Sequence, residues 1–307
     1  MKTFLSMCLL FLSTFFSSVD ANELFPRLRP ENDSILPLKF RLMTDDYLKK
    51  FDCSVSRDGL DQIRASASGQ FSEKSFEYFV KTLPTERIVV LDLRREFHGF
   101  INGCAVGWKQ VEPEGPPSYN YNIGMSLMQI EEAEIAFLQK LLTNKIDEYI
   151  TDDGKVNVLV ESISTERQLV EKMGFEYIRL PITDHEYPLD EEVDQIVEIV
   201  KSLPQNSWIH IHCAGGEGRS TTVMCMVDMM FNSHLSPLEI MQRQEAIGGS
   251  HVYDPENFFA QNPGRLPIGI QRRDFLEMFH RYCVENPNFT ESWSVWYSRQ
   301  SHLELKS

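Results

Sequence analysis

One segment around position 213 constrains the fold most. Residues 208–212, Trp-Ile-His-Ile-His, form a short apolar run typical of a buried strand. Residues 213–218 read Cys-Ala-Gly-Gly-Glu-Gly, and a helical pattern follows from 219 to 231. A strand, a glycine-rich turn and a helix in this order let consecutive backbone N–H groups converge on one anion, where the helix N-terminus adds partial positive charge. The segment therefore predicts a phosphate-binding loop in an α/β fold.

The same loop carries the residue types that nucleophilic chemistry on a phosphoryl group needs. The positive field of the loop, with Arg219, favours the thiolate of Cys213, which we expect to be the nucleophile. The planar guanidinium of Arg219 suits two phosphoryl oxygens and the trigonal-bipyramidal transition state. Ser220 is expected to support the thiolate as leaving group, and His212 to position the loop by hydrogen bonding. The loop residues expected to bind phosphate are Ala214, Gly215, Gly216, Glu217 and Gly218.

Two other interpretations of this loop remain. Cys213 is an inert core thiol at a strand end if its spacing from Arg219 is coincidental. A rhodanese-type sulfur carrier also places a cysteine loop before a helix, but it does not need an arginine six residues after the cysteine. The complete string, with strand and helix in the required places, favours the phosphatase interpretation.

A general acid is predicted on a second loop. Asp184 follows the apolar run 177–180 directly, and one helix and one strand then lead to Cys213. Both loops should therefore open at the same end of a parallel sheet, where active sites gather. We expect Asp184 to protonate the leaving group, the alternative being a solvated loop carboxylate.

The remaining pattern predicts alternating strands and helices. This order is typical of an α/β fold with a parallel sheet flanked by helices. We expect one compact catalytic unit from about residue 30, in which the front part is a candidate subdomain. A capping box with proline at the first helical position begins at Ser236. Further strands are predicted at 88–93, 156–160 and 177–180, and helices at 126–146, 165–173, 190–203 and 272–286.

The N-terminus predicts export. A lysine, the apolar run 4–16 and a small-x-small site ending at Ala21 are typical of a secretory signal, which leaves 22–307 as the phosphatase domain in the periplasm or outside the cell. The alternatives are a buried helix or a membrane anchor. The run is too short to span a bilayer and no later segment is long enough, so stable membrane insertion is not expected.

Composition excludes some partners and cofactors. The net charge of −15 argues against nucleic acid, because 45 acidic residues outnumber 30 basic ones. Removing residues 1–21 leaves five cysteines, so at least one thiol should stay unpaired, and Cys225 and Cys283 lie in helical apolar stretches typical of buried thiols. The cysteine spacings carry no zinc pattern. We expect no metal and no cofactor, since backbone amides and Arg219 supply the positive charge.

Further motifs resemble one family, the protein-tyrosine-phosphatase-like inositol polyphosphatases or cysteine phytases. The resemblance covers roughly residues 35–300. Besides the Cys213 loop, it rests on Leu-Pro-Leu-Lys-Phe-Arg at 36–41, Ala-Ser-Gly-Gln-Phe-Ser at 67–72, Asp-Leu-Arg-Arg-Glu-Phe-His-Gly-Phe at 92–100, Thr-Glu-Arg at 165–167, Thr-Asp-His at 183–185, Glu-Ala-Ile-Gly-Gly at 245–249 and Trp-Ser-Val-Trp at 293–296.

The resemblance implies both a fold and a set of roles. It implies a tyrosine-phosphatase-like α/β core with a mainly parallel central sheet flanked by helices, and a small partial β-barrel built mainly from the region before about 130. It makes Cys213 the nucleophile, Asp184 the acid and Arg219 a phosphate ligand. It also implies that Arg41 and His185 touch other phosphates of the substrate, although a solvated charge and a turn-stabilising residue are the respective alternatives.

The expected reaction is stepwise removal of phosphate from a myo-inositol polyphosphate such as phytate, a small-molecule substrate. Glu217 opposes a polyanion, and Ser162 stands where the family has a basic residue. Arg272 and Arg273 either compensate or are exposed helix charges. A protein tyrosine or dual-specificity phosphatase and a phosphoinositide phosphatase therefore remain alternatives, and a phosphate-binding pseudophosphatase is the non-enzymatic one.

Overall fold

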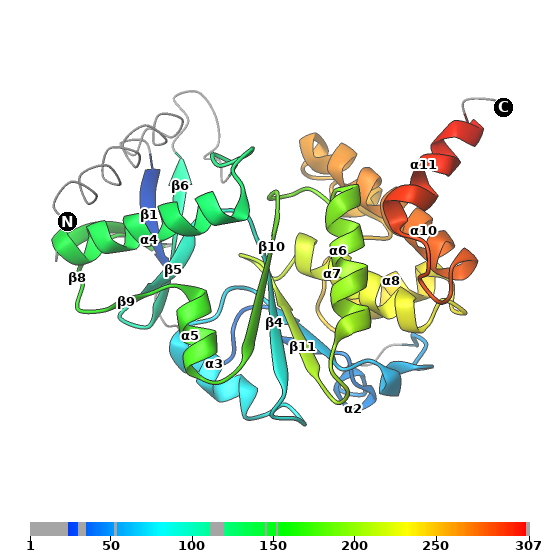
Figure 1. The fold of residues 1–307 in the computed structure, drawn as a ribbon, viewed down its shortest axis with the longest axis horizontal. Coiled ribbons are helices and arrows are strands. Elements are labelled where there is room, and N and C mark those ends of the chain that lie inside the picture. The colour runs from blue at the N-terminus through cyan, green and yellow to red at the C-terminus, as the bar shows by residue number, and fades with distance from the viewer. Residues whose placement is uncertain are drawn as a thin grey trace, which may run out of the picture. The chain divides into compact units, whose positions relative to one another are not determined.

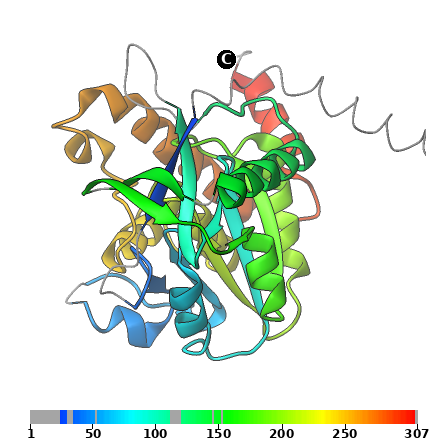
Figure 2. The same cartoon turned by 90° about the vertical axis from the view of Figure 1, so that its left-hand side faces the viewer.

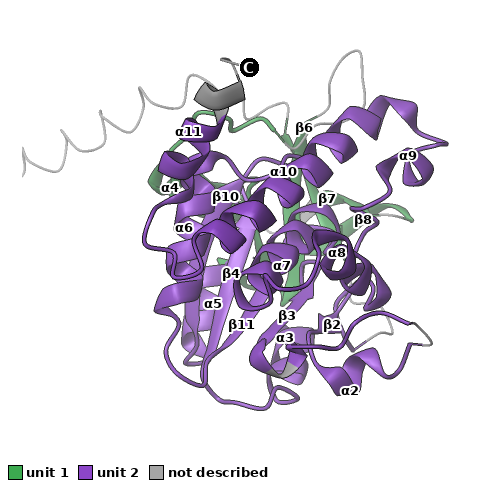
Figure 3. Ribbon diagram, turned by 90° about the vertical axis from the view of Figure 1, so that its right-hand side faces the viewer, with its two compact units in different colours: residues 1–30, 96–165 green, residues 31–95, 166–307 purple. Residues whose placement is uncertain are grey.

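The chain forms two compact units. A computed structural model describes residues 24–29, 35–51, 54–110, 120–144, 146–151 and 153–304, so the predicted signal segment 1–21 lies outside the described residues. The smaller unit combines residues 1–30 with 96–165, and the larger combines 31–95 with 166–307 (Figure 3).

A mainly parallel sheet forms the centre of the larger unit (Figure 1). The neighbours β10, β4, β11 and β3 pair in parallel, and β2 joins β3 in antiparallel fashion at one edge. In sheet order the strands are β10 (Glu176–Ile182), β4 (Ile88–Arg94), β11 (Trp208–His212), β3 (Ala65–Ser68) and β2 (Arg41–Leu42).

Helices cover both faces of this sheet. On one face, β-strand residues such as Leu91 and Ile211 pack with α6 (Asp190–Ser202) and α7 (Gly218–Phe231) in a single hydrophobic core. On the other face, Phe79 near the end of α3 (Glu73–Val80) packs on His210, and Phe71, in the segment before α3, packs on His212. The helix α5 (Glu166–Lys172) contacts β10 in this unit as well. The other helices of this unit are α2 (Asp45–Leu48), α8 (Pro237–Ala246), α9 (Pro255–Phe258), α10 (Leu266–Glu285) and α11 (Trp293–Glu304).

The smaller unit is a curled, half-barrel sheet of six strands with one long helix, α4 (Leu127–Asn144) (Figure 2). Its own core includes Trp108, Phe97 and Leu138. In sheet order its strands are β8 (Gly154–Leu159), β7 (Ile146–Thr151), β1 (Leu24–Arg29), β6 (Cys104–Gln110), β5 (His98–Ile101) and β9 (Ile163–Ser164).

The expected fold class is confirmed, with one strand misplaced. The predicted strands at 88–93, 177–180 and 208–212 are neighbours in the parallel sheet. The strand predicted at 156–160 belongs instead to an antiparallel hairpin of the smaller unit, because a tight turn at Gly154 folds β8 back on β7. Its apolar side chains are largely exposed, which a run of apolar letters does not reveal.

Several local predictions hold. Ser236 and Glu239 form the expected reciprocal capping box of α8. Cys225 and Cys283 are buried, unpaired thiols whose pKa values are raised by burial. In the part of the chain that the structure describes, no helix is both long and apolar enough to cross a membrane.

Candidate active site

The phosphate loop connects β11 to α7 and is pressed against the segment after β3. Cys213 is 3% exposed and Arg219 is 2% exposed. Gly216 has a positive φ of 74°, and a Cβ there would lie 2.6 Å from the carbonyl carbon of Ser68. The backbone N–H of Gln70 donates to the carbonyl of Ala214, at 3.1 Å. Only glycine fits this close approach, which holds the loop in one conformation.

Arg41 lies behind this loop. Its buried Nη1 donates to the carbonyl of Gly216 at 2.8 Å, and its Nη2 donates to Oγ1 of Thr221 at 3.2 Å. Burial lowers the pKa of Arg41 to about 10. The side chain is therefore not a solvated charge, and it braces the loop. The contact with a substrate phosphate that resemblance implies stays a prediction.

The loop and the predicted acid meet in an ion pair. Nη2 of Arg219 lies 2.9 Å from Oδ1 of Asp184. Nη1 of Arg219 also donates to the carbonyls of Leu93, at 3.3 Å, and Ile182, at 3.1 Å. Asp184 follows β10 as Cys213 follows β11, and both strands run parallel to β4. The expected meeting of the two loops at the carboxyl end of the sheet is thus observed.

His185 and Arg272 lie beside this pair. His185 has a positive φ of 68°, a half-exposed ring and an Nε2 atom 3.3 Å from Oδ2 of Asp184. Its carbonyl accepts from Nη2 of Arg272 at 2.7 Å. This carbonyl contact ties the acid loop to α10, so the turn-stabilising alternative for His185 has support, and its contact with substrate stays a prediction.

Arg272 is the site residue that sequence reasoning left undecided. It is 8% exposed, and its guanidinium lies so close to Gly218 that a Cβ there would be 3.0 Å from Nη2. Burial lowers its pKa, and its Nε is a buried donor with no hydrogen-bond partner among the described residues. The exposed-charge interpretation is wrong for Arg272, whereas Arg273 pairs with Glu256 at 2.9 Å. Helical spacing could have indicated that Arg272 is buried. It lies three residues after Gly269 and four before Leu276, on the face of α10 that these two residues bury.

Glu217 and Ser220 complete the predicted loop. The Glu217 side chain is 61% exposed and lies 3.9 Å from Nζ of Lys39, so its charge is partly offset. Its carbonyl accepts from the N–H of Thr221, which starts α7. Ser220 is buried, and its hydroxyl donates to the carbonyl of Ser68 at 3.4 Å. Gly215 has open space where a side chain would point.

A cavity of about 400 Å³ lies elsewhere in this unit. It is lined at the amino end of β11 by Ser207 and Ile209 and by the end of α7 at Phe231. Its two cations are engaged, because Arg64 donates to Asn206 and Lys201 to the carbonyl of Phe289. The convergent polar groups lie at the other end of the strand, so the Cys213 loop is the candidate site.

A cysteine loop of this geometry at the carboxyl end of a mainly parallel sheet, beside an acid on the next loop, defines the protein-tyrosine-phosphatase-like class of α/β proteins. The model of the PTP-like phytase family, described as "Inositol hexakisphosphate", matches residues 91–231. The chain belongs to this family, as the motifs along the sequence led us to expect.

Solved structures support the same assignment. The PTP-like myo-inositol phosphatase of Mitsuokella multacida, solved with myo-inositol-(1,3,4,5)-tetrakisphosphate, is 31% identical with a TM-score of 0.80 over 92% of this chain and 49% of that one. A PTP-like phytase of Bdellovibrio bacteriovorus is 25% identical with a TM-score of 0.69, over 91% of this chain and 96% of that one.

A curated relative is a bacterial effector. Effector protein hopD2 of Pseudomonas syringae pv. tomato is 28% identical over 266 residues, which are 82% of this chain and 55% of that protein. The chain thus spans about half the length of hopD2 and of the Mitsuokella enzyme.

Proposed function

We propose that this protein is a phosphatase that removes phosphates from inositol polyphosphates through a phospho-cysteine on Cys213. The observation that carries the proposal is the 2.9 Å pair between Arg219, in the nucleophile's loop, and Asp184, on the neighbouring loop. It brings a nucleophile, a phosphate ligand and an acid to one end of the sheet, which is the set that phosphoryl transfer through cysteine requires.

In the first step the thiolate of Cys213 attacks phosphorus in line with the bond to the inositol oxygen. The S–P bond forms, the P–O bond breaks, and the leaving alkoxide takes the proton of Asp184. The loop N–H groups and Arg219 hold the equatorial oxygens, where charge is greatest in the transition state. Arg219 passes from Asp184 to the phosphoryl group when substrate binds.

In the second step water attacks the phospho-cysteine. Asp184, now a carboxylate, accepts a proton from the water, the S–P bond breaks, and inorganic phosphate leaves with the Cys213 thiolate restored. Ser220 stands one residue after Arg219 in the first turn of α7, and its hydroxyl is the proposed donor to the departing sulfur. The cycle consumes one water and one phosphomonoester.

Several features support a polyanionic substrate. The matched family model carries the description inositol hexakisphosphate, and the Mitsuokella relative was solved with an inositol tetrakisphosphate. In this chain Arg219 and Arg272 converge near the loop, and the buried Nε of Arg272 remains available to an anion. Lys39 offsets the one acidic side chain within the loop, Glu217.

A substrate panel tests the proposal. Purified protein is assayed for phosphate release from phytate, lower inositol phosphates, phosphoinositides and phosphotyrosyl peptides, and we expect turnover of the soluble inositol phosphates. Hydrolysis of phosphotyrosyl peptides alone would instead support a protein tyrosine phosphatase. Cys213→Ser should abolish release while still binding inositol phosphate, and acid quenching of the wild type should trap phosphate on the Cys213 peptide. If the wild type bound inositol phosphate but released no phosphate from it, the pseudophosphatase interpretation would be supported instead.

A further inference from the structure

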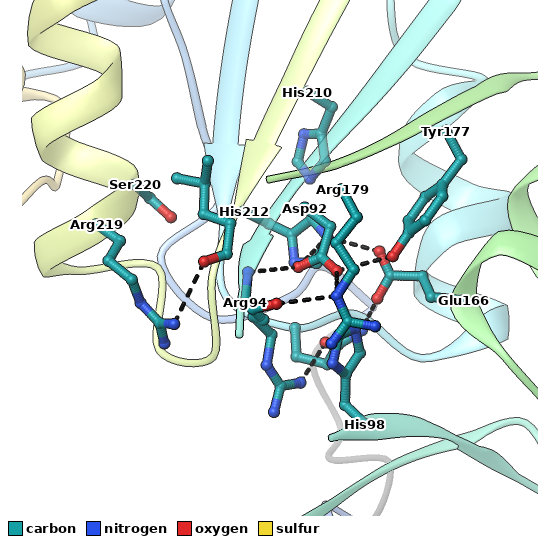
Figure 4. Close-up of polar contacts among 12 residues, drawn as sticks. Asp92, Arg94, His98, Glu166, Tyr177, Arg179, His210, His212, Arg219 and Ser220 are labelled. Atoms are coloured by element: carbon teal, nitrogen blue, oxygen red, sulfur yellow. Dashed lines mark hydrogen bonds and ion pairs between the residues drawn. The ribbon is translucent and has the colours of Figure 1, made fainter. Parts of the chain in front are cut away.

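A second buried histidine lies on the same strand as His212. His210 stands two residues earlier on β11, so the two side chains point to the same face of the sheet, with ring centroids 6.2 Å apart (Figure 4). The surroundings of the two rings differ. Nε2 of His212 lies 2.6 Å from Oε1 of Glu166 and 3.8 Å from Oδ1 of Asp92. His210 is fully buried as well, but it contacts two serine hydroxyls and several aromatic rings.

The two serines belong to the neighbouring strand β3. Ser66 lies opposite His210 in the register of β3 and β11, and Ser68 lies two residues further along. Oγ of Ser66 lies 2.9 Å from Nδ1 of His210, and Oγ of Ser68 lies 3.1 Å from Nε2. Both serines are fully buried. Each ring nitrogen therefore has a hydroxyl partner, as a buried imidazole requires.

The contacts of Ser66 favour one direction for these hydrogen bonds. The indole Nε1–H of Trp208 donates to Oγ of Ser66 at 2.8 Å. An indole nitrogen can only donate, so this bond uses a lone pair of the hydroxyl and leaves its proton for an acceptor. Nδ1 of His210 is the acceptor that the described contacts of this hydroxyl offer. The hydroxyl of Ser66 therefore donates to an Nδ1 that carries no proton.

The contacts of Ser68 give the same direction independently. Its hydroxyl donates to the carbonyl of Gly69 at 2.6 Å, and a carbonyl oxygen can only accept. Toward His210 the oxygen of Ser68 can then only accept, so Nε2 carries a proton. Burial lowers the pKa of His210 well below its usual value, so the ring is neutral and has a single ring proton. Four hydrogen bonds thus run in one direction, from Trp208 through Ser66, His210 and Ser68 to the carbonyl of Gly69.

This chain of hydrogen bonds ends where the backbone after β3 meets the phosphate loop. A Cβ at Gly69 would lie 3.0 Å from the carbonyl carbon of Gly215, and a Cβ at Gly216 would lie 2.4 Å from the backbone nitrogen of Gly69. The carbonyl of Ser68 also accepts from the hydroxyl of Ser220, at 3.4 Å. The last bond of the chain, from Ser68 to Gly69, therefore holds the two residues against which the loop packs.

Packing alone does not explain a histidine at this position. The ring of His210 lies among Phe40, Phe71 and Phe79, with ring centroids 6.2, 6.1 and 4.5 Å away. A phenylalanine would fill such an aromatic site without burying polar atoms. The imidazole costs desolvation free energy, which its two hydrogen bonds offset, and one of those bonds leads toward the phosphate loop.

We propose that His210 is a positioning residue, whose Nε2–H tautomer holds Ser68 and the backbone of Gly69 against the phosphate loop. The inference rests on the proposed function in taking that loop as the place where the phosphoryl group is held. His210 acts on the reaction only through Ser68 and Gly69. Its consequence is that the loop donors keep the positions that the transition state requires, because small displacements of such groups cost rate.

The tautomer is measured first, on the full-length wild-type protein. With ¹⁵N-labelled histidine, a long-range ¹H–¹⁵N correlation spectrum distinguishes the protonated ring nitrogen from the unprotonated one, and the signals that are missing from His210→Gln identify His210. We expect Nε2 to carry the proton and Nδ1 to carry none. A proton on Nδ1, alone or together with one on Nε2, overturns the proposal whether or not the protein releases phosphate.

Three substitutions at His210 separate positioning from packing. His210→Phe fills the aromatic site but breaks both hydrogen bonds, and it should lower kcat about tenfold with KM little changed, because the loop donors act mainly in the transition state. His210→Asn places its amide near the position of Nδ1 and loses the donor to Ser68, so it should lose as much activity. His210→Gln places an amide N–H near the position of Nε2 and should retain most of the activity. Full activity in His210→Phe, or a larger loss in His210→Gln than in His210→Asn, contradicts the proposal.

A double variant tests the route from His210 to the loop. Ser68→Ala removes the next link and should lower kcat to a similar extent, and its combination with His210→Phe should cause no further loss. Losses that multiply would mean that His210 acts by another route, which contradicts the proposal.

A matched control separates positioning from stability. Asn286 is a buried, hydrogen-bonded side chain just after α10, close in the chain to Phe289, which lines the cavity at the amino end of β11. Asn286→Ala should lower the melting temperature and leave kcat unchanged. A kcat that follows melting temperature in both Asn286→Ala and His210→Phe contradicts the proposal.

Failure of the proposed function would be recognised separately. A wild type that has the expected tautomer but releases no phosphate from any phosphomonoester refutes the proposed function, and calorimetric binding of inorganic phosphate then carries the comparison of variants. Weaker binding by His210→Phe than by His210→Gln supports the positioning role. Equal binding by the wild type and His210→Phe overturns it.

Discussion

The two loops that form the site are built in opposite ways. The phosphate loop is buried at Cys213 and Arg219 and is braced by the segment after β3 and by Arg41. In the acid loop at 183–189, the carboxyl of Asp184 is 17% exposed and Leu189 is 64% exposed. The acid loop makes one described hydrogen bond to α10, from Arg272 to the carbonyl of His185.

The difference in burial and bracing between the two loops suits the different tasks proposed for them. Groups that stabilise transition-state charge work best when they are fixed in advance and shielded from water. A general acid must recover or release its proton in each cycle, which access to water permits, and loops that carry such acids often move. Arg219 connects the two loops, because it belongs to the fixed phosphate loop and pairs with Asp184, the proposed acid, of the other loop.

The largest expected effect comes from changing Arg219 in the fixed phosphate loop. Arg219→Lys should lower kcat by about 10⁴-fold, because an ammonium cannot hold two equatorial oxygens and the arginine that stabilises phosphoryl charge carries an effect of this order. Steady-state phosphate release measures it. Arg273→Lys, on α10 and paired with Glu256, is the matched control and should retain activity. A loss under tenfold would mean that the loop amides alone hold the phosphoryl group.

The next effect concerns the more exposed loop, which carries Asp184. Asp184→Asn should lower kcat by about 10³-fold with an alkyl leaving group, since the alkoxide then leaves without a proton. The wild-type rate should fall as pH rises, because Asp184 is deprotonated and can no longer donate a proton. This alkaline fall in rate should disappear in the variant. Glu186→Gln, two residues along the same loop, should keep it. If the variant retains the alkaline fall, the acid is another residue.

A third change tests the bracing of the phosphate loop. Gly216→Ala should lower kcat by about 10²-fold, since a Cβ at this positive φ would meet the backbone of Ser68 and displace the donors. Gly264→Ala is the matched control, because a Cβ there meets no atom within 4 Å. Kinetics and thermal melting of both variants measure the effect. Equal activity in the two would show that the loop does not depend on this close contact.

The site could be predicted where its signal is local. The strand at 208–212, the glycine-rich turn and the helix after it are consecutive, so one stretch of sequence specifies the proposed anion site and the proposed nucleophile. Asp184 was predicted as the acid because it follows a predicted strand, with one helix and one further strand between it and Cys213. In the structure, β10 and β11 both run parallel to β4. In both cases the order of elements along the chain determines which end of the sheet a residue reaches.

The parts of the fold and of the site that the sequence pattern did not predict depend on contacts between segments that are far apart in the chain. β3 reads Ala-Ser-Ala-Ser and lacks the apolar pattern of a strand, yet all four residues are buried between neighbouring strands and helices. The contact between Glu166 and His212 depends on α5 placing Glu166 against the end of β11, which no spacing in the sequence specifies. Likewise β1 pairs with β6, about eighty residues later, so the sheet of the smaller unit was predicted only through resemblance.

The smallest expected effect concerns the outer rim of the phosphate loop, where the fixed loop meets solvent. Glu217 is 61% exposed and lies 3.9 Å from Lys39, so its repulsion of a polyanion is screened by water and partly offset. Glu217→Gln should lower KM for an inositol polyphosphate about threefold at low salt with kcat unchanged, and the difference should shrink as ionic strength rises. Glu198→Gln, 69% exposed and on α6, is the matched control and should leave KM unchanged. A rise in KM would mean that Glu217 helps to order the loop through Lys39, and the rim would then belong with the fixed side of the comparison.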